Sequence, residues 1–139
     1  MKKKMVCTML TAVMAMATIG APVSASAADK EKTIGVVVWD MAQSFEASLA
    51  EIAEKEIEER GWKCVLMDPS GDWAKMYTDI NDLVTQGVDG IIYTAIDTEG
   101  ANDAVDLAHE AGIPIIDFDC LASKGGADAS VRYDDYAGG

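Results

Sequence analysis

The sequence has one histidine, three cysteines and few basic residues, and each scarcity excludes a class of function. His109 has no second histidine to join it, so we expect neither a zinc site nor histidine-based catalysis, and a solvated side chain beside Glu110. Against 11 Lys and Arg stand 24 Asp and Glu, which gives a formal net charge of −13. Such a chain repels nucleic acid and anionic lipid, so we expect neither as a partner.

The first 27 residues have the layout of a secretory signal peptide. Three lysines precede an apolar segment from Met5 to Ile19, and Ala25 and Ala27 fit the small-x-small cleavage pattern. Because the apolar segment is short, we predict cleavage after residue 27 and no stable membrane insertion afterwards. The remaining chain carries 8 basic and 24 acidic residues, a net charge of −16. We expect an acidic, soluble protein in the periplasm, the cell envelope or the extracellular space.

Residues 28–139 suffice for one domain with a single core. Unbroken β-branched runs such as "TIGVVVW" favour parallel strands that are covered on both faces. We predict strands at Thr33–Trp39, Trp62–Met67, Val88–Ala95, Ile113–Phe118 and Ala129–Tyr133. Helices are expected at Phe45–Gly61, from Trp73 to Gly87, and through Val105 and Ala108 to Gly112. Strands that alternate with helices in this way predict an α/β fold, a parallel Rossmann-like sheet with helices on both faces.

Short polar residues and glycines mark the expected helix ends. Ser44 is predicted to cap the first helix and Gly61 to end it; Asp68 or Asp72 is predicted to cap the second, and Asp97 or Thr98 the third. Cys64 lies in the middle of a predicted strand and Cys120 at the end of another. We therefore expect no disulfide between them.

The ligand of an open parallel sheet sits outside the carboxyl ends of the strands. The loops expected there carry Asp40, Gln43 and Ser44; Asp68 and Asp72; Asp97 and Thr98; Asp119 and Cys120; and Asp134 and Asp135. Trp39 and Phe45 flank the first of these loops. Planar carboxylate and amide groups pair with vicinal hydroxyls, and an aromatic ring packs on the C–H face of a pyranose. The rim therefore has the chemistry of a sugar-binding site.

The stretch "GIPIIDFDC" permits a second interpretation. A strand followed by Asp-x-Asp can hold Mg²⁺, so an exported Mg²⁺-dependent α/β phosphatase or hydrolase would use Asp97, Asp117 and Asp119. The small-residue loop that follows Cys120 is not typical of such enzymes. We therefore interpret Asp119 as a ligand acceptor and Asp117 as facing the sheet or a helix end. We predict no enzyme activity, no metal and no cofactor; an extracellular sugar-sensing domain for a signalling partner stays open as a third hypothesis.

From Thr33 to Gly139 the chain resembles the amino-terminal lobe of the type I periplasmic solute-binding proteins, in the ribose-binding-protein-like branch. The resemblance is carried by "TIGVVVWDMAQSFEASLAEIAEKEIEERG", "GVDGIIYTAIDTEGANDAVDLAHEAGIPIIDFD" and "YDDYAGG". It implies a two-lobed, non-enzymatic receptor that closes on a monosaccharide or related polyol and delivers it to an ABC permease or a chemoreceptor. Since the sequence stops at "DDYAGG", we expect residues 28–139 to be a truncated amino-terminal lobe without its second lobe.

The resemblance also implies a set of ligand-binding residues: Trp39, Asp40, Gln43, Phe45, Asp119 and Cys120. Gln43 takes the place of the family's asparagine, Phe45 that of its first stacking phenylalanine, and Asp119 that of its sugar-binding aspartate. Two positions depart from the pattern, because Glu46 replaces a second aromatic and Cys120 replaces an arginine. A thiol lacks the five donors of a guanidinium, so we expect a ligand preference that differs from ribose.

Overall fold

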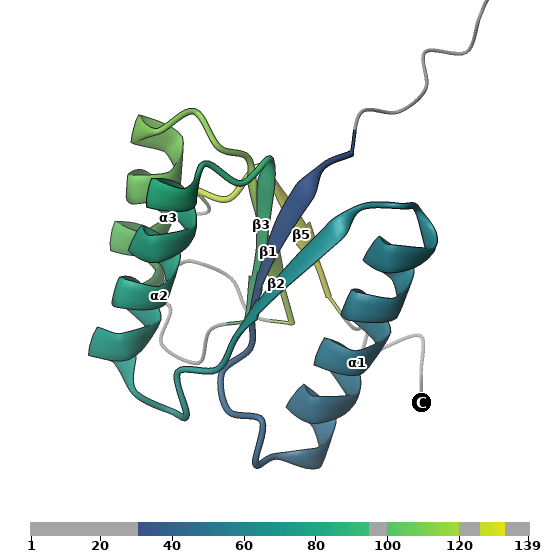
Figure 1. Ribbon diagram of the computed structural model, residues 1–139. Helices are drawn as coiled ribbons and strands as arrows, with labels where there is room; N and C mark the ends of the chain where they lie inside the picture. Colours follow the sequence, from purple (N-terminus) through teal and green to yellow (C-terminus); the bar gives the residue numbers. More distant parts are fainter. Residues whose placement is uncertain (1–30, 95–99, 120–125, 133–139) are drawn as a thin grey trace, which may run out of the picture.

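The structure, a computed structural model, describes residues 31–94, 100–119 and 126–132 as alternating strands and helices (Figure 1). The elements in chain order are β1 (Thr33–Val37), α1 (Ser44–Glu59), β2 (Lys63–Met67), α2 (Trp73–Gln86), β3 (Gly90–Thr94), α3 (Gly100–Glu110), β4 (Ile115–Phe118) and β5 (Ala129–Val131). The predicted α/β fold and the order of its elements are confirmed. Within the described residues, each strand is one or two residues shorter than predicted.

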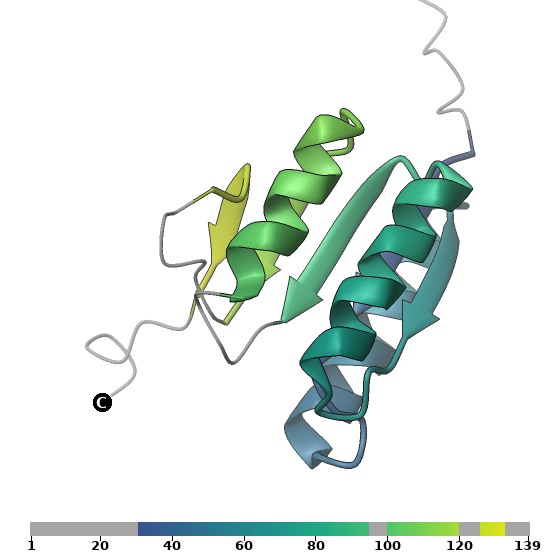
Figure 2. The same cartoon turned by 90° about the vertical axis from the view of Figure 1, so that its left-hand side faces the viewer.

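The five strands form one parallel sheet in the order β2-β1-β3-β4-β5. The chain moves one way across the sheet from β1 to β2, and the other way from β2 to β3 and on to β4. Right-handed crossovers therefore place α1 on one face and both α2 and α3 on the other, as Figure 2 shows. The direction reverses between β1 and β3, which makes that pair the topological switch point of the sheet.

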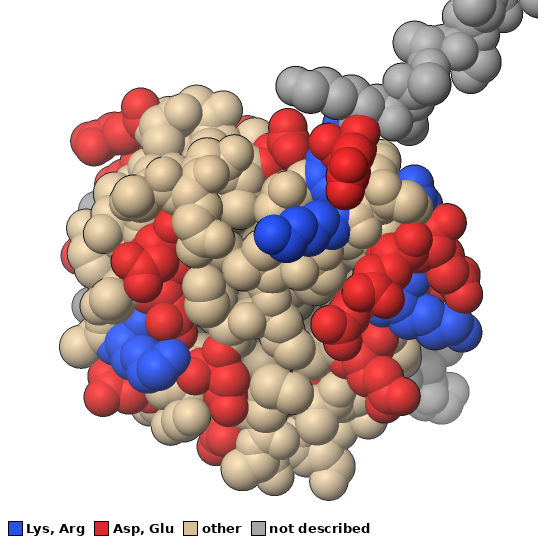
Figure 3. Space-filling view, in the orientation of Figure 1, with Lys and Arg blue, Asp and Glu red and all other residues tan. Residues whose placement is uncertain are grey.

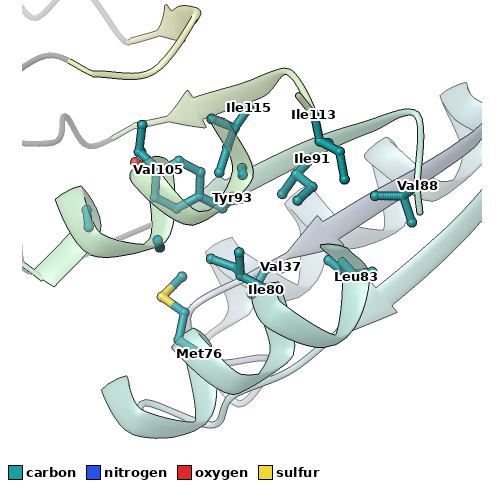
Figure 4. Close-up of a cluster of buried hydrophobic side chains, with 13 residues drawn as sticks. Val37, Met76, Ile80, Leu83, Val88, Ile91, Tyr93, Val105, Ile113 and Ile115 are labelled. Atoms are coloured by element: carbon teal, nitrogen blue, oxygen red, sulfur yellow. The ribbon is translucent and has the colours of Figure 1, made fainter. Parts of the chain in front are cut away.

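The main core lies between the sheet and the α2–α3 layer (Figure 4). Val37, Ile91, Tyr93 and Ile115 from the strands pack against buried residues of the two helices, which are Met76, Ile80, Leu83, Ala101, Ala104, Val105 and Ala108. Helix α2 packs so tightly on β1 that a Cβ atom at Gly35 would lie 2.5 Å from Leu83 Cδ1. Glycine at that position lets the helix contact the strand backbone directly.

Among the described residues, the opposite face of the sheet is only partly covered. Helix α1 packs over β1 and β2 and buries Val36, Val38, Ala50 and Ile57. Beyond it, Ile92, Ile116 and Phe118 of β3 and β4 are half-buried, and Ile52 of α1 is 63% exposed. Two apolar cavities of about 360 and 280 Å³ open over these strands beside α1. The larger one lies at the amino ends of the strands, next to Lys32, Asp89 and Pro114, and so away from the expected ligand edge.

The caps predicted from the sequence agree with the structure in α2, but the predicted start of α1 does not. Asp72 caps α2, because its side chain accepts a hydrogen bond from the Lys75 backbone, and Gly87 ends the helix in the left-handed conformation. In α1 the cap position is Gln43, without a side-chain cap bond, and Ser44 is the first helical residue. The prediction of Ser44 as the cap is therefore wrong, whereas Gly61 follows the end of α1 with a φ of 72° as predicted. Asp97 and Thr98 lie outside the described residues.

Charged side chains on the helices pair locally. Lys55–Glu59, Glu56–Arg60 and Lys75–Asp79 are all ion pairs four residues apart. On the face shown in Figure 3 the basic side chains lie next to acidic ones. The first two pairs are exposed and contribute only a few tenths of a kcal/mol each, whereas Asp79 in the third pair is buried. The pairs leave most of the acidic charge without a counter-charge, which is consistent with a surface that does not attract polyanions.

The sequence predicts a solvated His109, but in the structure its side chain has a partner. Its Nε2 lies 3.2 Å from Asp128 Oδ2, and the same carboxylate oxygen accepts a hydrogen bond of 2.9 Å from the Ile115 backbone N–H. The Ile115 bond, reinforced by His109, lowers the pKa of Asp128 below its ordinary value. The pair joins the end of α3 to the segment that leads into β5.

Cys64 is a free, half-buried thiol on β2. Burial, with the nearby carboxylates of Glu54 and Glu58, raises the pKa of its thiol from 9.0 to about 11. The thiol therefore stays protonated at neutral pH and is a poor nucleophile. The prediction that it forms no disulfide with Cys120 is not tested, because Cys120 lies outside the described residues.

Asp117 is the one buried carboxyl group in the described core for which neither oxygen has a hydrogen-bond partner there. It is 1% exposed and pairs in register with Tyr93 of β3 and Ser130 of β5. It lies two residues beyond Ile115, on the same side of β4, and so faces the α3 layer. The sequence predicts that Asp117 faces the sheet or a helix end, and in the structure it is buried between the sheet and the α3 layer. A buried group without a partner costs about 1 to 3 kcal/mol.

We expect Asp72→Ala to lower the free energy of unfolding by about 1 kcal/mol, because it removes the side-chain cap of α2. Ser44→Ala is the matched control, since Ser44 caps nothing and its substitution should change stability by less than about 0.5 kcal/mol. Urea denaturation of both variants measures the difference. Equal losses in the two variants would contradict the assignment of the caps.

We expect Asp117→Val to raise the free energy of unfolding by roughly 1 kcal/mol or more, because valine fills a similar volume without an unsatisfied group. Asp79→Val is the control: Asp79 is also buried, but it binds Lys75 Nζ at 2.7 Å, so its substitution should bring no such gain. Thermal and urea unfolding test both variants. A loss of stability in Asp117→Val would show that its carboxylate has a stabilising partner.

Candidate functional site

The loops at the carboxyl edge of the sheet gather around the switch point between β1 and β3. This is the lower end of the sheet in Figure 1, where β1 passes into the loop that leads to α1. Trp39 lies two residues beyond the end of β1, Thr94 ends β3, and Asp119 directly follows β4. Parallel strands bring all their carboxyl ends to one edge, so the residues predicted after β1 and after β4 share this edge.

Trp39 is anchored at three points. Its backbone N–H donates to Thr94 Oγ1 at 2.8 Å, and its carbonyl accepts from the Gly71 N–H at 2.8 Å. Its ring contacts the ring of Trp73, with a centroid distance of 5.4 Å and planes tilted by 56°. The side chain is half-buried and packs against the main core. Trp39 therefore joins β1, the end of β3 and the loop before α2, and only part of its ring remains available to a ligand.

Glu46 is buried in the first turn of α1, where it is only 8% exposed. Its Oε2 accepts a hydrogen bond of 2.8 Å from the Thr94 hydroxyl and a longer one, 3.3 Å, from the Trp39 N–H. The amino terminus of a helix carries partial positive charge, which favours a carboxylate there. Two hydrogen bonds and the helix terminus together offset the cost of burying this group.

The β1–α1 loop presents the other predicted ligand residues of this segment. Asp40 is half-buried, and one of its oxygens accepts from the Ala42 N–H at 2.9 Å, which shapes the turn. Gln43 is exposed and makes no side-chain cap bond with α1. Phe45 projects from the first turn of α1 and is 57% exposed. The loop thus offers an amide and a large aromatic face to solvent at the carboxyl edge.

Asp119 follows β4 with a backbone φ of 67°, in the left-handed region. Aspartate tolerates this conformation better than most residues, at a cost of order 1 kcal/mol. Its N–H donates to the Val131 carbonyl at 2.8 Å, so the strained position is tied to β5, and its side chain is exposed. The left-handed turn ends the alternation of the strand and leaves the carboxylate in solvent.

The two carboxylates of the Asp-x-Asp stretch therefore lie in different environments. Asp117 is buried under the α3 layer, whereas Asp119 is exposed beyond the end of β4. In the described ranges, no three His, Cys, Asp or Glu residues are arranged to hold a metal ion. Asp97, which the phosphatase hypothesis also required, lies outside these ranges. The geometry supports the interpretation of Asp119 as an acceptor in its own right.

The loop after β2 supports the first loop from the side. Asp68 Oδ1 accepts from the Ser70 N–H at 2.8 Å and from the Met41 N–H at 3.3 Å. The Asp68 side chain thus holds the two loops together and does not cap α2. Of the remaining predicted edge residues, Cys120, Asp134 and Asp135 lie outside the described part of the chain.

The sequence analysis missed one residue of this edge and the true role of another. Thr94 is 2% exposed and joins Trp39 to Glu46, a role that its place in the predicted strand Val88–Ala95 does not indicate. The sequence pattern marks Glu46 only as a departure from an aromatic residue. The available signal was a hydroxyl at the end of the otherwise apolar run "GIIYT", which indicates a polar partner nearby.

The chain matches known proteins over most of its length. The family described as "periplasmic binding protein domain" matches residues 34–139. The ribose import binding protein of Bacillus subtilis is 34% identical over 110 residues, which cover 79% of this chain and 36% of that protein. The chain therefore spans little more than a third of that relative's length. None of the helices in the described residues is long and apolar enough to span a membrane.

Two solved structures agree with the fold. An ABC transporter solute-binding protein of Clostridium with bound L-rhamnose has a TM-score of 0.70 at 25% identity, over 76% of this chain and 33% of that one. One from Bacillus halodurans with bound myo-inositol has a TM-score of 0.64 at 26% identity, over 72% of this chain and 35% of that one. The parallel sheet, its carboxyl-edge site and these matches lead to one conclusion: the chain belongs to the periplasmic binding protein domain family.

Proposed function

We propose that this chain forms a ligand-binding lobe of an extracytoplasmic protein that captures a monosaccharide or related polyol for an ABC transporter. The observation that carries the proposal is the carboxyl edge at the switch point, where an exposed aromatic ring, an amide and an exposed carboxylate border one edge. Ribose, L-rhamnose and myo-inositol appear in the names of similar proteins, which supports a polyhydroxylated ligand.

Each residue of the edge has a distinct role in the proposed capture. Asp119 accepts hydrogen bonds from ligand hydroxyls, and Gln43 both donates and accepts through its amide. Phe45 packs against the apolar C–H face of the sugar ring. Asp40 and the accessible part of Trp39 complete the first loop, and Cys120 stands beside Asp119 in the sequence. Strands β1 and β4 are two strand spacings apart, roughly 10 Å, so one ligand contacts both loops.

The proposed activity is binding without chemical conversion. Asp119 is exposed, whereas its Asp-x-Asp partner Asp117 is buried under the α3 layer, so the two carboxylates are not presented together to one ligand. A two-lobed receptor gains affinity by closing over the ligand and excluding water. Since this chain spans about a third of its ribose-binding relative, we infer that a second lobe completes the site in the full receptor.

The same reasoning supports the proposed location and partners. The Lys-rich start, apolar segment and Ala-x-Ala pattern of residues 1–27 direct the chain out of the cytoplasm. There the liganded receptor meets the permease of an ABC transporter. A chemoreceptor or another signalling partner would recognise the same closed, liganded form. Transport and sensing would therefore depend on the same binding of the ligand.

Titration of the ¹⁵N-labelled chain with D-ribose, L-rhamnose, myo-inositol and D-glucose tests the proposal. We expect at least one to shift the amide signals of residues 39–45 and of Asp119, with a dissociation constant of roughly millimolar order because one lobe alone cannot enclose the ligand. Asp119→Asn should weaken binding at least about tenfold, since a charge-assisted acceptor is lost. Asparagine also tolerates the left-handed backbone, so the fold should persist.

Asp82→Asn, on the exposed surface of α2, is the matched control and should bind like the parent chain. The proposal fails if none of these compounds shifts the carboxyl-edge amides, or if the shifts map to the amino end of the sheet. Equal binding by Asp119→Asn and the parent chain would remove Asp119 from the site.

A further inference from the structure

We propose that Glu46 and Thr94 are positioning residues that hold the β1–α1 loop in its ligand-binding conformation before any sugar arrives. We name this pair, with the Trp39 backbone that it holds, the loop lock. The inference rests on the proposed function, because it assigns a role in sugar binding to residues that border the site. Neither residue is among the ligand contacts expected from the sequence.

The loop lock is a relay of hydrogen bonds through three segments. The Trp39 N–H donates to Thr94 Oγ1 at 2.8 Å, and the Thr94 hydroxyl donates in turn to Glu46 Oε2 at 2.8 Å. The Thr94 oxygen thus accepts one bond and donates the next, an arrangement in which each bond polarises the other. Because the final acceptor is a carboxylate, the relay is stronger than a chain of neutral groups.

The lock sits where the two strands of the switch point diverge. The register of β1 and β3 ends at the pair Val37 and Tyr93. Beyond that pair, the Thr94 hydroxyl accepts a hydrogen bond from the backbone N–H of Trp39, so a side chain continues the connection between the strands. Glu46, which lies 48 residues before Thr94, bonds to the Thr94 hydroxyl and so joins the first turn of α1 to the same point. The β1–α1 loop is therefore fixed at Trp39 on one side and at the start of α1 on the other.

A packing role alone does not account for a carboxylate at this position. Glu46 and Thr94 are 8% and 2% exposed, so each is desolvated on folding. An apolar side chain would fill the space without that cost. A buried polar network fixes its members in one geometry, which apolar packing does not. The loop between the fixed points carries Asp40 and Gln43, so the geometry that is fixed is that of the proposed ligand residues.

The two residues are too buried to be ligand contacts themselves, and they act through the loop. A loop that is already ordered loses less conformational entropy when the ligand binds, which increases affinity without a new contact. Loss of the lock should therefore weaken sugar binding and increase loop motion together, while the sheet stays folded.

Thr94→Val tests the inference, because valine keeps the shape of threonine but cannot join the relay. Thr94→Ser restores the hydroxyl and is the rescue variant. Thr78→Val is the matched control, since the Thr78 hydroxyl bonds only to the Ala74 carbonyl within α2. For each variant, ¹⁵N relaxation gives the order parameters of residues 40–43 without sugar, and amide shifts give the affinity for myo-inositol.

We expect Thr94→Val to lower the order parameters of this loop and to weaken binding about fivefold or more, as the loss of one hydrogen bond implies. Thr94→Ser should recover most of both, and Thr78→Val should change neither. Glu46→Gln should have an intermediate effect, because its amide oxygen still accepts from Thr94 but carries no charge.

Unchanged loop order in Thr94→Val would overturn the inference, and so would lower order with unchanged affinity. Failure of serine to restore the loop would show that shape, not the hydroxyl, matters. If the parent chain binds none of the four compounds, the proposed function fails, and the order parameters alone decide whether the lock exists.

Discussion

The hydrogen bond from the Trp39 N–H to the Thr94 hydroxyl is the contact on which the carboxyl edge depends. It joins β1 to β3 just past the end of their backbone ladder, and Glu46 completes it from α1. The Trp39 carbonyl and ring extend the connection to Gly71 and Trp73 before and within α2. One residue thus unites four segments at the point where an open parallel sheet binds its ligand.

The rest of the architecture explains why the proposed site lies at this edge. Parallel strands gather their carboxyl ends there, and the helices that follow them begin there with partial positive charge. That charge stabilises the buried carboxylate of Glu46 in α1. The left-handed backbone at Asp119 ends the strand and leaves the carboxylate of Asp119 in solvent. The opposite edge has neither feature, although an apolar cavity of about 360 Å³ opens beside it.

The sequence predicted the fold well because buried parallel strands and capped helices have local signals. The apolar runs, Asp72 and Gly87 each act through neighbours in the chain, and all three predictions are confirmed. The prediction of Ser44 as the cap is wrong because the backbone turn from Asp40 to Gln43 starts α1 at Ser44, one residue earlier than predicted. The roles of Glu46 and Thr94 depend on a contact between residues 48 positions apart, and the strain at Asp119 depends on its bond to β5. The hydroxyl at the end of β3 indicates that a polar partner exists, but no local pattern identifies that partner.

The central claim is that the carboxyl edge is formed in the absence of ligand, with Trp39 held between β1 and β3. Hydrogen exchange of the Trp39 amide in the sugar-free chain tests it most directly, because that proton is the first donor of the relay. The account predicts that it exchanges as slowly as the ladder amides of β1 and β3. Exchange as fast as that of an amide without a hydrogen bond would contradict it, since an edge that opens so readily would not be formed before the ligand binds.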